Sequence, residues 1–360
     1  MPNKSKKGNN PTIRIKDIAE KAGVSIGTVD RVLHNRGEVS EKTKKKVLAI
    51  VKELNYQPNL LASSLALKKE IPFAVLIPKA HDDDSYWMKP LDGIQKAANE
   101  MAQYGIRIKY HFFDMMDKST FTSAMEKALA DNPRGILFSP YFTNESVKAA
   151  ELLQEMEIPF VLIDSNLKQI DKLSYLGHDA QQSGYLAGRL LDLCTPKDQS
   201  VAILNFGKET ENLSHLKRRK EGFLTYFEQN NPNRELHVLK SEDEDVEYLA
   251  SLLTPVLRKD KMPLAGIFVP NSKIYRVATF IKQYEHEGIH LIGYDLISKN
   301  VEAIKGGLID FLVCQRPEEQ GYKGIYTLFE HVVARKEAIK ENFTSIDIIT
   351  RENIDYYRFL

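Results

Sequence analysis

The spacing of apolar residues changes along the chain. From residue 71 onward, short apolar runs alternate with longer stretches of helical spacing. The first series has runs at 73–78, 108–113, 135–140 and 160–164, with helical stretches near 91–104, 120–130 and 146–156. The second has runs at 201–206, 236–240, 266–270 and 291–295, with helical stretches near 216–229, 246–257 and 274–284. This alternation predicts parallel sheets covered by helices on both faces. Two series predict two similar doubly wound lobes.

The N-terminal residues have a different pattern, made of short helical stretches. Apolar residues recur at helical spacing from Ile15 to Ala22 and stop at Gly23, which tolerates the positive φ of a helix end. Ser25 is expected to cap a second helix from Ile26 to about Leu33, in which Val29 faces the first helix. Small, glycine and β-branched residues at these offsets are typical of a helix-turn-helix.

A third helix is expected from about Glu41 to Leu54, capped by Ser40, before Pro58 interrupts the pattern. Asn59 can cap a further short helix over 60–67, which contains Ala62 for close approach and the apolar Leu65. A helix of this length is marginal alone in water, so it would fold only against a partner. The alternative for this segment is a plain linker.

Charge divides the chain in the same place as the apolar pattern. Residues 1–70 carry 15 Lys and Arg against 7 Asp and Glu, a net charge of +8, whereas the remainder has a net charge of −7. A small basic domain is the electrostatic footprint expected of a nucleic-acid-binding protein. A lysine-rich solvated face is the alternative.

Several other classes of protein lack support in the sequence. No run approaches the ~20 apolar residues of a membrane span, and no apolar run follows the basic N-terminus, so a cytoplasmic protein is expected. Cys194 and Cys314 have no metal-ligand spacing and suit a reducing compartment. The HExxH-like stretch 286–290 is interrupted by Gly288, so no bound metal is expected there. No other cofactor is expected either.

In a doubly wound fold the ligand lies beyond the carboxyl ends of the strands. Three polar residues stand there: Asp164 after 160–163, Asn271 after 266–270 and Asp295 after 291–294. These residues are the first candidates for contact with a small molecule.

Residues 12–66 resemble, without a gap, the DNA-binding headpiece and hinge helix of the lactose- and galactose-repressor (LacI/GalR) family. The later lobes resemble that family's effector domain, itself similar to periplasmic sugar-binding proteins. The resemblance implies an all-α helix-turn-helix headpiece with a hinge helix, followed by an α/β periplasmic-binding-protein-like (type I) domain of two doubly wound lobes. The implied boundaries are a basic tail at 1–11, a DNA-binding domain at 12–57, a hinge at 58–70 and an effector-binding and dimerisation domain at 71–360.

The resemblance also implies which residues meet DNA. Ile26, Gly27 and Arg31 fall on positions that face base edges, and Leu65 on the hinge position that wedges into the minor groove. Ile26 and Gly27 can offer only apolar contact and close approach, so Arg31 would carry most direct readout. Asp30 departs from the family's usual serine. The full implied set is Ser25, Ile26, Gly27, Thr28, Arg31, His34, Asn59, Ala62 and Leu65.

For the effector, the resemblance implies contacts from the arginine of the R-x-x-G-F motif and from residues at strand ends. Tyr86 and Trp87 follow the first strand, and an aromatic ring suits the apolar face of a sugar. The full implied set is Tyr86, Trp87, Asp164, Arg219, Asn271, Asp295 and Gln315. In the alternative interpretation, Asp295 only caps the helix that follows it, and Arg219 only forms an ion pair with a neighbouring glutamate.

The sequence therefore predicts a dimeric, sugar-responsive transcriptional regulator of a pseudo-palindromic operator, expected to repress and not to be an enzyme. One alternative is a periplasmic-type sugar receptor for a transporter, which would leave the headpiece without a role. Another is an enzyme of doubly wound fold, for which no nucleophile–base constellation appears. A third is a regulator with a non-sugar effector such as a nucleobase.

Overall fold

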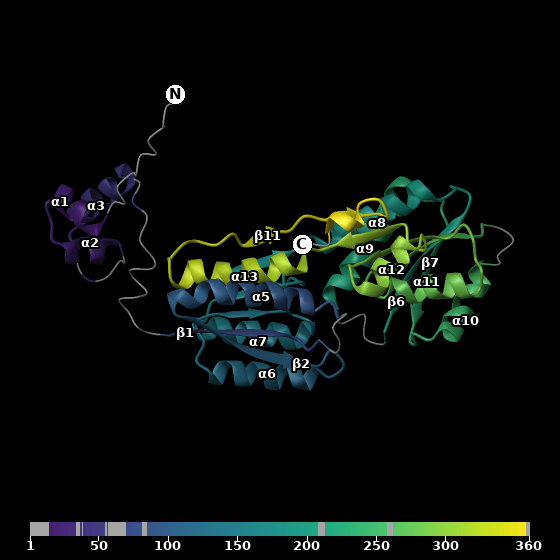
Figure 1. The fold of residues 1–360 in the computed structure, drawn as a ribbon, viewed down its shortest axis with the longest axis horizontal. Coiled ribbons are helices and arrows are strands. Elements are labelled where there is room, and N and C mark those ends of the chain that lie inside the picture. The colour runs from purple at the N-terminus through teal and green to yellow at the C-terminus, as the bar shows by residue number, and fades with distance from the viewer. Residues whose placement is uncertain are drawn as a thin grey trace, which may run out of the picture. The chain divides into compact units, whose positions relative to one another are not determined.

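The fold is taken from a computed structural model that describes residues 14–33, 37, 39–54, 56, 70–80, 85–207, 213–257 and 262–357. They fall into two compact units, one within residues 1–66 and the other within 67–360 (Figure 1). None of the helices in these ranges has both the length and the apolar character needed to cross a bilayer.

The first unit contains three helices, α1 (Ile15–Ala22), α2 (Ile26–Leu33) and α3 (Glu41–Glu53). Gly23 ends α1 with a φ of 64°, the left-handed value that a side chain would disfavour. Ser40 caps α3 by accepting a hydrogen bond from the amide of Thr43. The core includes the fully buried Val29 of α2, so the predicted helix-turn-helix is confirmed.

The first lobe of the second unit is a six-stranded sheet of order β11-β5-β4-β3-β1-β2. Its strand pairs are all parallel. The strands are β1 (Ile71–Pro78), β2 (Ile106–Phe113), β3 (Ile136–Phe138), β4 (Phe160–Ile163), β5 (Ser174–Gly177) and β11 (Glu341–Phe343). The helices of this lobe are α5 (Met88–Met101), α6 (Lys118–Ala130), α7 (Thr143–Glu155) and α13 (Pro317–Val332), with a 3-10 turn at Ala102–Tyr104.

The second lobe has a sheet of order β12-β10-β9-β8-β6-β7, in which only the β10–β12 pair is antiparallel. The strands are β6 (Ser200–Phe206), β7 (Leu236–Ser241), β8 (Leu264–Phe268), β9 (His290–Tyr294), β10 (Phe311–Cys314) and β12 (Asp347–Ile349). The helices are α8 (Ala180–Cys194), α9 (Ser214–Asn230), α10 (Val246–Leu257), α11 (Ile274–Gln283) and α12 (Ser298–Lys305), followed late in the chain by a 3-10 turn at Ile354–Tyr357.

The chain passes between the lobes three times, after β5, after β10 and after β11. The second passage returns α13 to the first lobe, where it packs along α5 (Figure 1). The two predicted lobes are confirmed, but the apolar pattern did not predict β5, α8, β10, α13 or the short strands β11 and β12. Three connecting segments therefore link the two lobes.

Helices α8 and α9 approach so closely that two glycines are required. A Cβ on Gly184 would lie 1.9 Å from the carbonyl oxygen of Arg219, and one on Gly222 would lie 1.9 Å from that of Gln181. Because real Cβ atoms do not come that close to backbone atoms, these glycines fix where α9 presents Arg219.

Candidate functional site

The first candidate site is the exposed face of α2. Ser25, Ile26, Gly27 and Arg31 are exposed and Thr28 is half-buried, whereas Val29 and Val32 on the opposite face are buried. The Ser25 hydroxyl accepts a hydrogen bond from the Thr28 amide at 3.1 Å, which holds the start of the helix. Both Ile26 and Arg31 are thus accessible on α2, where an apolar side chain can contact a thymine methyl and a guanidinium can contact a guanine edge.

Four predicted DNA-contacting residues lie outside the described residues: His34, Asn59, Ala62 and Leu65. The expected hinge helix at 60–67 lies there too.

The second candidate site lies where β4, β9 and β10 end. Asp164 follows β4 and Asp295 follows β9, with φ values of 67° and 70°. Left-handed backbone is unfavourable for a non-glycine residue and occurs preferentially at binding and active sites. Arg316, two residues past β10, has a φ of 52° as well.

A buried hydrogen-bonded chain joins three of the predicted effector residues. The Arg219 guanidinium donates through Nη2 to Oε1 of Gln315 at 2.7 Å, and Nε2 of Gln315 donates to Oδ1 of Asp295 at 2.8 Å. Arg219 also donates to the Pro270 carbonyl at 2.7 Å and stacks on the Tyr294 ring, 3.8 Å from its centre. All three members of the chain are less than 10% exposed, so their geometry is fixed before any ligand arrives.

Asp164 holds the first-lobe side of the site. Its Oδ1 accepts a hydrogen bond from the Tyr86 hydroxyl at 3.1 Å, and its amide donates to Gln320 of α13 at 2.9 Å. Trp87 is buried and meets the Tyr86 ring edge-on at 5.1 Å between centres. The Tyr86 ring is therefore held between Asp164 and Trp87.

Asn271 is placed next to this network without joining it, because its side-chain oxygen accepts from the amide of Lys273. The two structural alternatives do not hold. Ile297, not Asp295, precedes the first turn of α12. Arg219 bonds to Pro270 and Gln315 and not to a glutamate.

The sequence did not single out two histidines beside this network. His178 lies in the first passage between lobes with Nε2 3.4 Å from Arg219 Nη2, and His215 accepts from or donates to the Ser165 hydroxyl at 2.7 Å. His215 precedes Arg219 by four residues on α9, a spacing that puts both on one helix face and could have indicated it. No comparable signal marks His178. The buried Nδ1 of His178 and Nε of Arg219 have no hydrogen-bond partner among the described residues, so a ligand oxygen could satisfy them.

Burial determines the protonation of this site. It raises the pKa of Asp295 to about 7, although the Arg219 charge and the Gln315 hydrogen bond act in the opposite direction. Burial and the Arg219 charge lower the pKa of His178 well below its ordinary value, and burial lowers that of His215 to about 4. Both imidazoles are therefore neutral at pH 7 and can each donate and accept a hydrogen bond.

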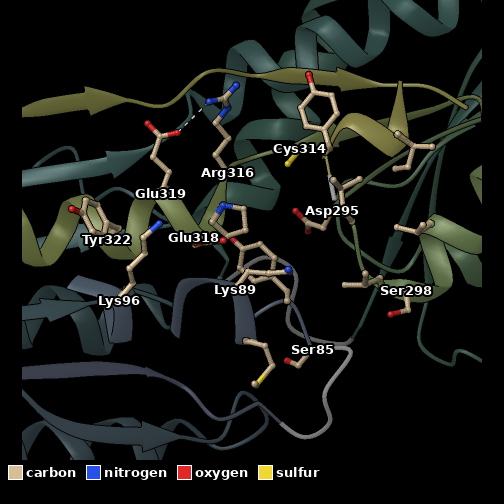
Figure 2. Close-up of a pocket in the computed structure, with 18 residues that line it drawn as sticks. Ser85, Lys89, Lys96, Asp295, Ser298, Cys314, Arg316, Glu318, Glu319 and Tyr322 are labelled. Atoms are coloured by element: carbon tan, nitrogen blue, oxygen red, sulfur yellow. Dashed lines mark hydrogen bonds and ion pairs between the residues drawn. The ribbon is translucent and has the colours of Figure 1, made fainter. Parts of the chain in front are cut away.

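Two hollows flank the network. A cavity of about 530 Å³ is lined by Tyr86, Asp295 and residues of α5, α12 and α13 (Figure 2). A hollow of about 20 Å³, roughly enough for one water molecule, is lined by Asp164, His178 and His215. The described residues hold no cluster of three or more His, Cys, Asp or Glu side chains that could bind a metal ion.

Two families match the chain in succession. Residues 14–59 match the bacterial regulatory proteins of the lacI family, and residues 73–336 match the periplasmic binding protein domain. The chain has a LacI-family domain near its N-terminus and belongs, over residues 73–336, to the periplasmic binding protein family. The two-lobed fold of the second domain agrees with that match.

Known relatives and solved structures agree with these two matches. The transcriptional regulator MalR of Streptococcus pneumoniae is 30% identical over 178 residues, 48% of this chain and 51% of MalR. The sucrose operon repressor of Staphylococcus xylosus is 28% identical over 225 residues, 62% of this chain and 64% of that protein. The chain thus matches about half to two thirds of the length of these curated relatives. A structure solved for a candidate LacI transcriptional regulator from Bacteroides fragilis has a TM-score of 0.75 at 29% identity, over 80% of this chain and all of that one.

Proposed function

We propose that this chain is a sequence-specific transcriptional repressor whose DNA binding is controlled by a sugar or sugar derivative bound between the two lobes. One observation carries the proposal: a helix-turn-helix with polar and apolar side chains exposed on α2 and a buried network of polar side chains at the strand ends of a two-lobed domain occur in one chain. The names of the relatives, a sucrose operon repressor among them, support repression and a sugar effector.

The polar network supports a ligand rich in hydroxyl groups. Each hydroxyl needs both a donor and an acceptor, and Asp164, Asp295, Arg219 and Gln315 supply both kinds within one site. The Tyr86 ring supplies an apolar surface of the kind that packs against a sugar ring. No cofactor is part of the proposal.

The operator is proposed to be a pseudo-palindrome bound by a homodimer in the cytoplasm. A reading helix covers a few base pairs, so paired half-sites are the usual route to specificity for this motif. The basic N-terminal region, with its net charge of +8, would make the affinity fall steeply with salt.

Selection from random DNA with the purified full-length chain, followed by gel shifts, tests the proposal. We expect one two-fold symmetric sequence bound at least ~10³-fold more tightly than random DNA at physiological salt. Equal affinity for selected and random DNA would exclude a sequence-specific regulator. A thermal-shift screen of sugars on the same protein tests the effector, because a ligand of the native state raises the melting temperature.

A further inference from the structure

A hydrogen bond of the site runs directly from one lobe to the other. Ser165 follows β4 in the first lobe, and His215 lies in the first turn of α9 in the second lobe. The Oγ atom of Ser165 and the Nδ1 atom of His215 are 2.7 Å apart. A bond between residues of different lobes persists only while the lobes keep the angle that brings its two atoms together.

The other hydrogen bonds of the effector site depend less on that angle. The bonds between Arg219, Gln315 and Asp295 lie in the second lobe and the passage that follows β10. The bond between Tyr86 and Asp164 lies within the first lobe. A rotation of the lobes can leave both sets intact, whereas it separates the two partners of the bond between the lobes.

Ser165 continues this bond into the first lobe. Its hydroxyl donates to Oδ2 of Asp164 at 3.2 Å, and Oδ1 of the same carboxylate accepts from Tyr86. Because the serine has a single proton to donate, Nδ1 of His215 is the donor in the bond between the lobes. Burial lowers the pKa of His215 to about 4, so this donor is a neutral imidazole at pH 7.

The two lobes lie close together around this bond. The hollow beside it has room for roughly one water molecule and is lined by Ser165 and Tyr175 from the first lobe and by His215 and Arg218 from the second. Ser165 is 1% exposed, so water has little access to its hydroxyl. A buried polar group that loses its partner is unfavourable, and separation of the lobes therefore carries a penalty at this point.

We propose that Ser165 and His215 form a latch that stabilises the lobe angle of this structure. His215 is then a positioning residue, which acts on the effector site by holding the two lobes in place. The latch itself does not depend on the identity of the effector. Its consequence for DNA rests on the proposed function, in which the lobe angle controls operator binding, so loss of the latch should change operator affinity without any sugar.

Double electron–electron resonance between two spin labels, one in each lobe, tests the latch in the full-length chain without sugar or DNA. The labels are attached at Lys127→Cys on α6 and Lys282→Cys on α11, both exposed positions, in a Cys194→Ala background. Cys314 is retained, because it is buried and burial raises its pKa to about 12, which leaves its thiol unreactive. An excess of unlabelled protein removes distances between chains.

We expect Ser165→Ala and His215→Phe each to shift the mean distance between the labels by at least ~2 Å, the scale of a hinge movement. The double variant should shift it no further than the larger of the two single shifts, because both substitutions remove the same bond. His215→Asn should restore the wild-type distance, since the asparagine amide can donate from the position of Nδ1.

His290→Phe is the matched control, because Nδ1 of His290 bonds to Asp310 within the second lobe at 2.9 Å. It should leave the distance between the labels unchanged. A wild-type distance in both Ser165→Ala and His215→Phe overturns the latch, and so does an equal shift in His215→Phe and His215→Asn.

Operator affinity, measured with the sequence selected from random DNA, separates the latch from the proposed function. Ser165→Ala and His215→Phe should change this affinity at least ~3-fold in the same direction, as the loss of a hydrogen bond allows. A shifted distance with unchanged operator affinity retains the latch and contradicts control of DNA binding by the lobe angle.

Discussion

Arg219 is the residue on which the effector site depends most. It is 2% exposed, and it joins Pro270, Gln315 and, through Gln315, Asp295. Removing it leaves buried acceptors without a donor, a loss of roughly 1–3 kcal/mol for a neutral group and more where charge is involved. We expect Arg219→Ala to weaken the binding of any sugar found in the screen at least ~10-fold in calorimetry.

Lys217→Ala provides the control for this variant, since Lys217 is exposed on the same helix. It should change sugar affinity by less than ~2-fold. If Arg219→Ala binds the sugar as wild type does, the ligand lies elsewhere in the chain.

Asp295 should make the stability of the second domain depend on pH. Its folded pKa of about 7 lies above the ordinary value of 3.8, so the folded state holds the proton more tightly than the unfolded state. The burial penalty on the charged carboxylate is therefore absent below pH ~4, grows as pH rises toward 7, and is constant above. Asp295→Asn should raise the free energy of unfolding relative to wild type by roughly 2–4 kcal/mol at pH 8 and by little at pH 4.

Urea unfolding at both pH values measures this difference, with the exposed Glu302→Gln as a variant that should show none. A stability difference between Asp295→Asn and wild type that is the same at pH 4 and pH 8 would mean that the carboxyl titrates normally in the folded chain.

Arg31 is the residue expected to read a base. It is exposed on α2, as are Ile26 and Gly27, neither of which can donate a side-chain hydrogen bond. Arg31→Ala should cost ~1–3 kcal/mol of operator affinity and relax the preference at one base pair per half-site. Selection from random DNA checks this, and an unchanged sequence preference would make Arg31 a phosphate contact.

At the scale of elements, the α8–α9 contact should control the site through Gly184. A methyl group there meets the Arg219 carbonyl oxygen, which belongs to the backbone and cannot rotate away. We expect Gly184→Ala to destabilise the chain by ~1–3 kcal/mol, as overpacking does, and to lower sugar affinity as well, because α9 must shift.

Gly188→Ala separates the two effects. Gly188 lies one turn further along α8, where an added Cβ lies 2.9 Å from Cβ of Tyr226, seven residues past Arg219 on α9, so the overlap is smaller than at Gly184 and further from the site. It should lower the melting temperature and reduce sugar affinity less than Gly184→Ala does. Loss of affinity in both variants to the same extent would show that α8 acts through global stability alone.

The strands that the sequence predicted differ in length and in apolar pattern from those that it did not. The strands β1, β6 and β9 are continuous apolar runs buried on both faces, so their pattern identifies them. Strand β5 reads Ser-Tyr-Leu-Gly, and β11 and β12 are three residues each, so tertiary pairing defines them more than local pattern. The site residues at strand ends could be anticipated for the same reason, whereas His178 could not, because only the unpredicted passage after β5 brings it to Arg219.

For the whole molecule, the two-lobe design explains how a small ligand could affect DNA binding. The site draws on both lobes and on two of the passages between them, with His178 in the first and Gln315 in the second, so a ligand that prefers one lobe angle stabilises that angle. Under the proposed function, operator binding also favours one lobe angle, so the same ligand changes operator affinity, because coupling between two sites is a shared free energy. Coupling of this kind is typically 1–3 kcal/mol, or about 5–150-fold in affinity.

Control of DNA binding by a sugar at Arg219 is therefore tested most directly by the operator affinity of the full-length chain with and without a saturating sugar, for wild type and Arg219→Ala. The operator is the sequence selected from random DNA, the sugar is the strongest stabiliser in the thermal-shift screen, and fluorescence anisotropy gives the affinity. We expect the sugar to change the operator affinity of the wild-type chain at least ~5-fold and to leave that of Arg219→Ala unchanged. Without the sugar, the two proteins should bind the operator with affinities within ~3-fold of each other. A sugar that stabilises the wild-type chain but leaves its operator affinity unchanged would contradict control of DNA binding by the sugar. An equal response in both proteins would contradict a role for Arg219 in that control.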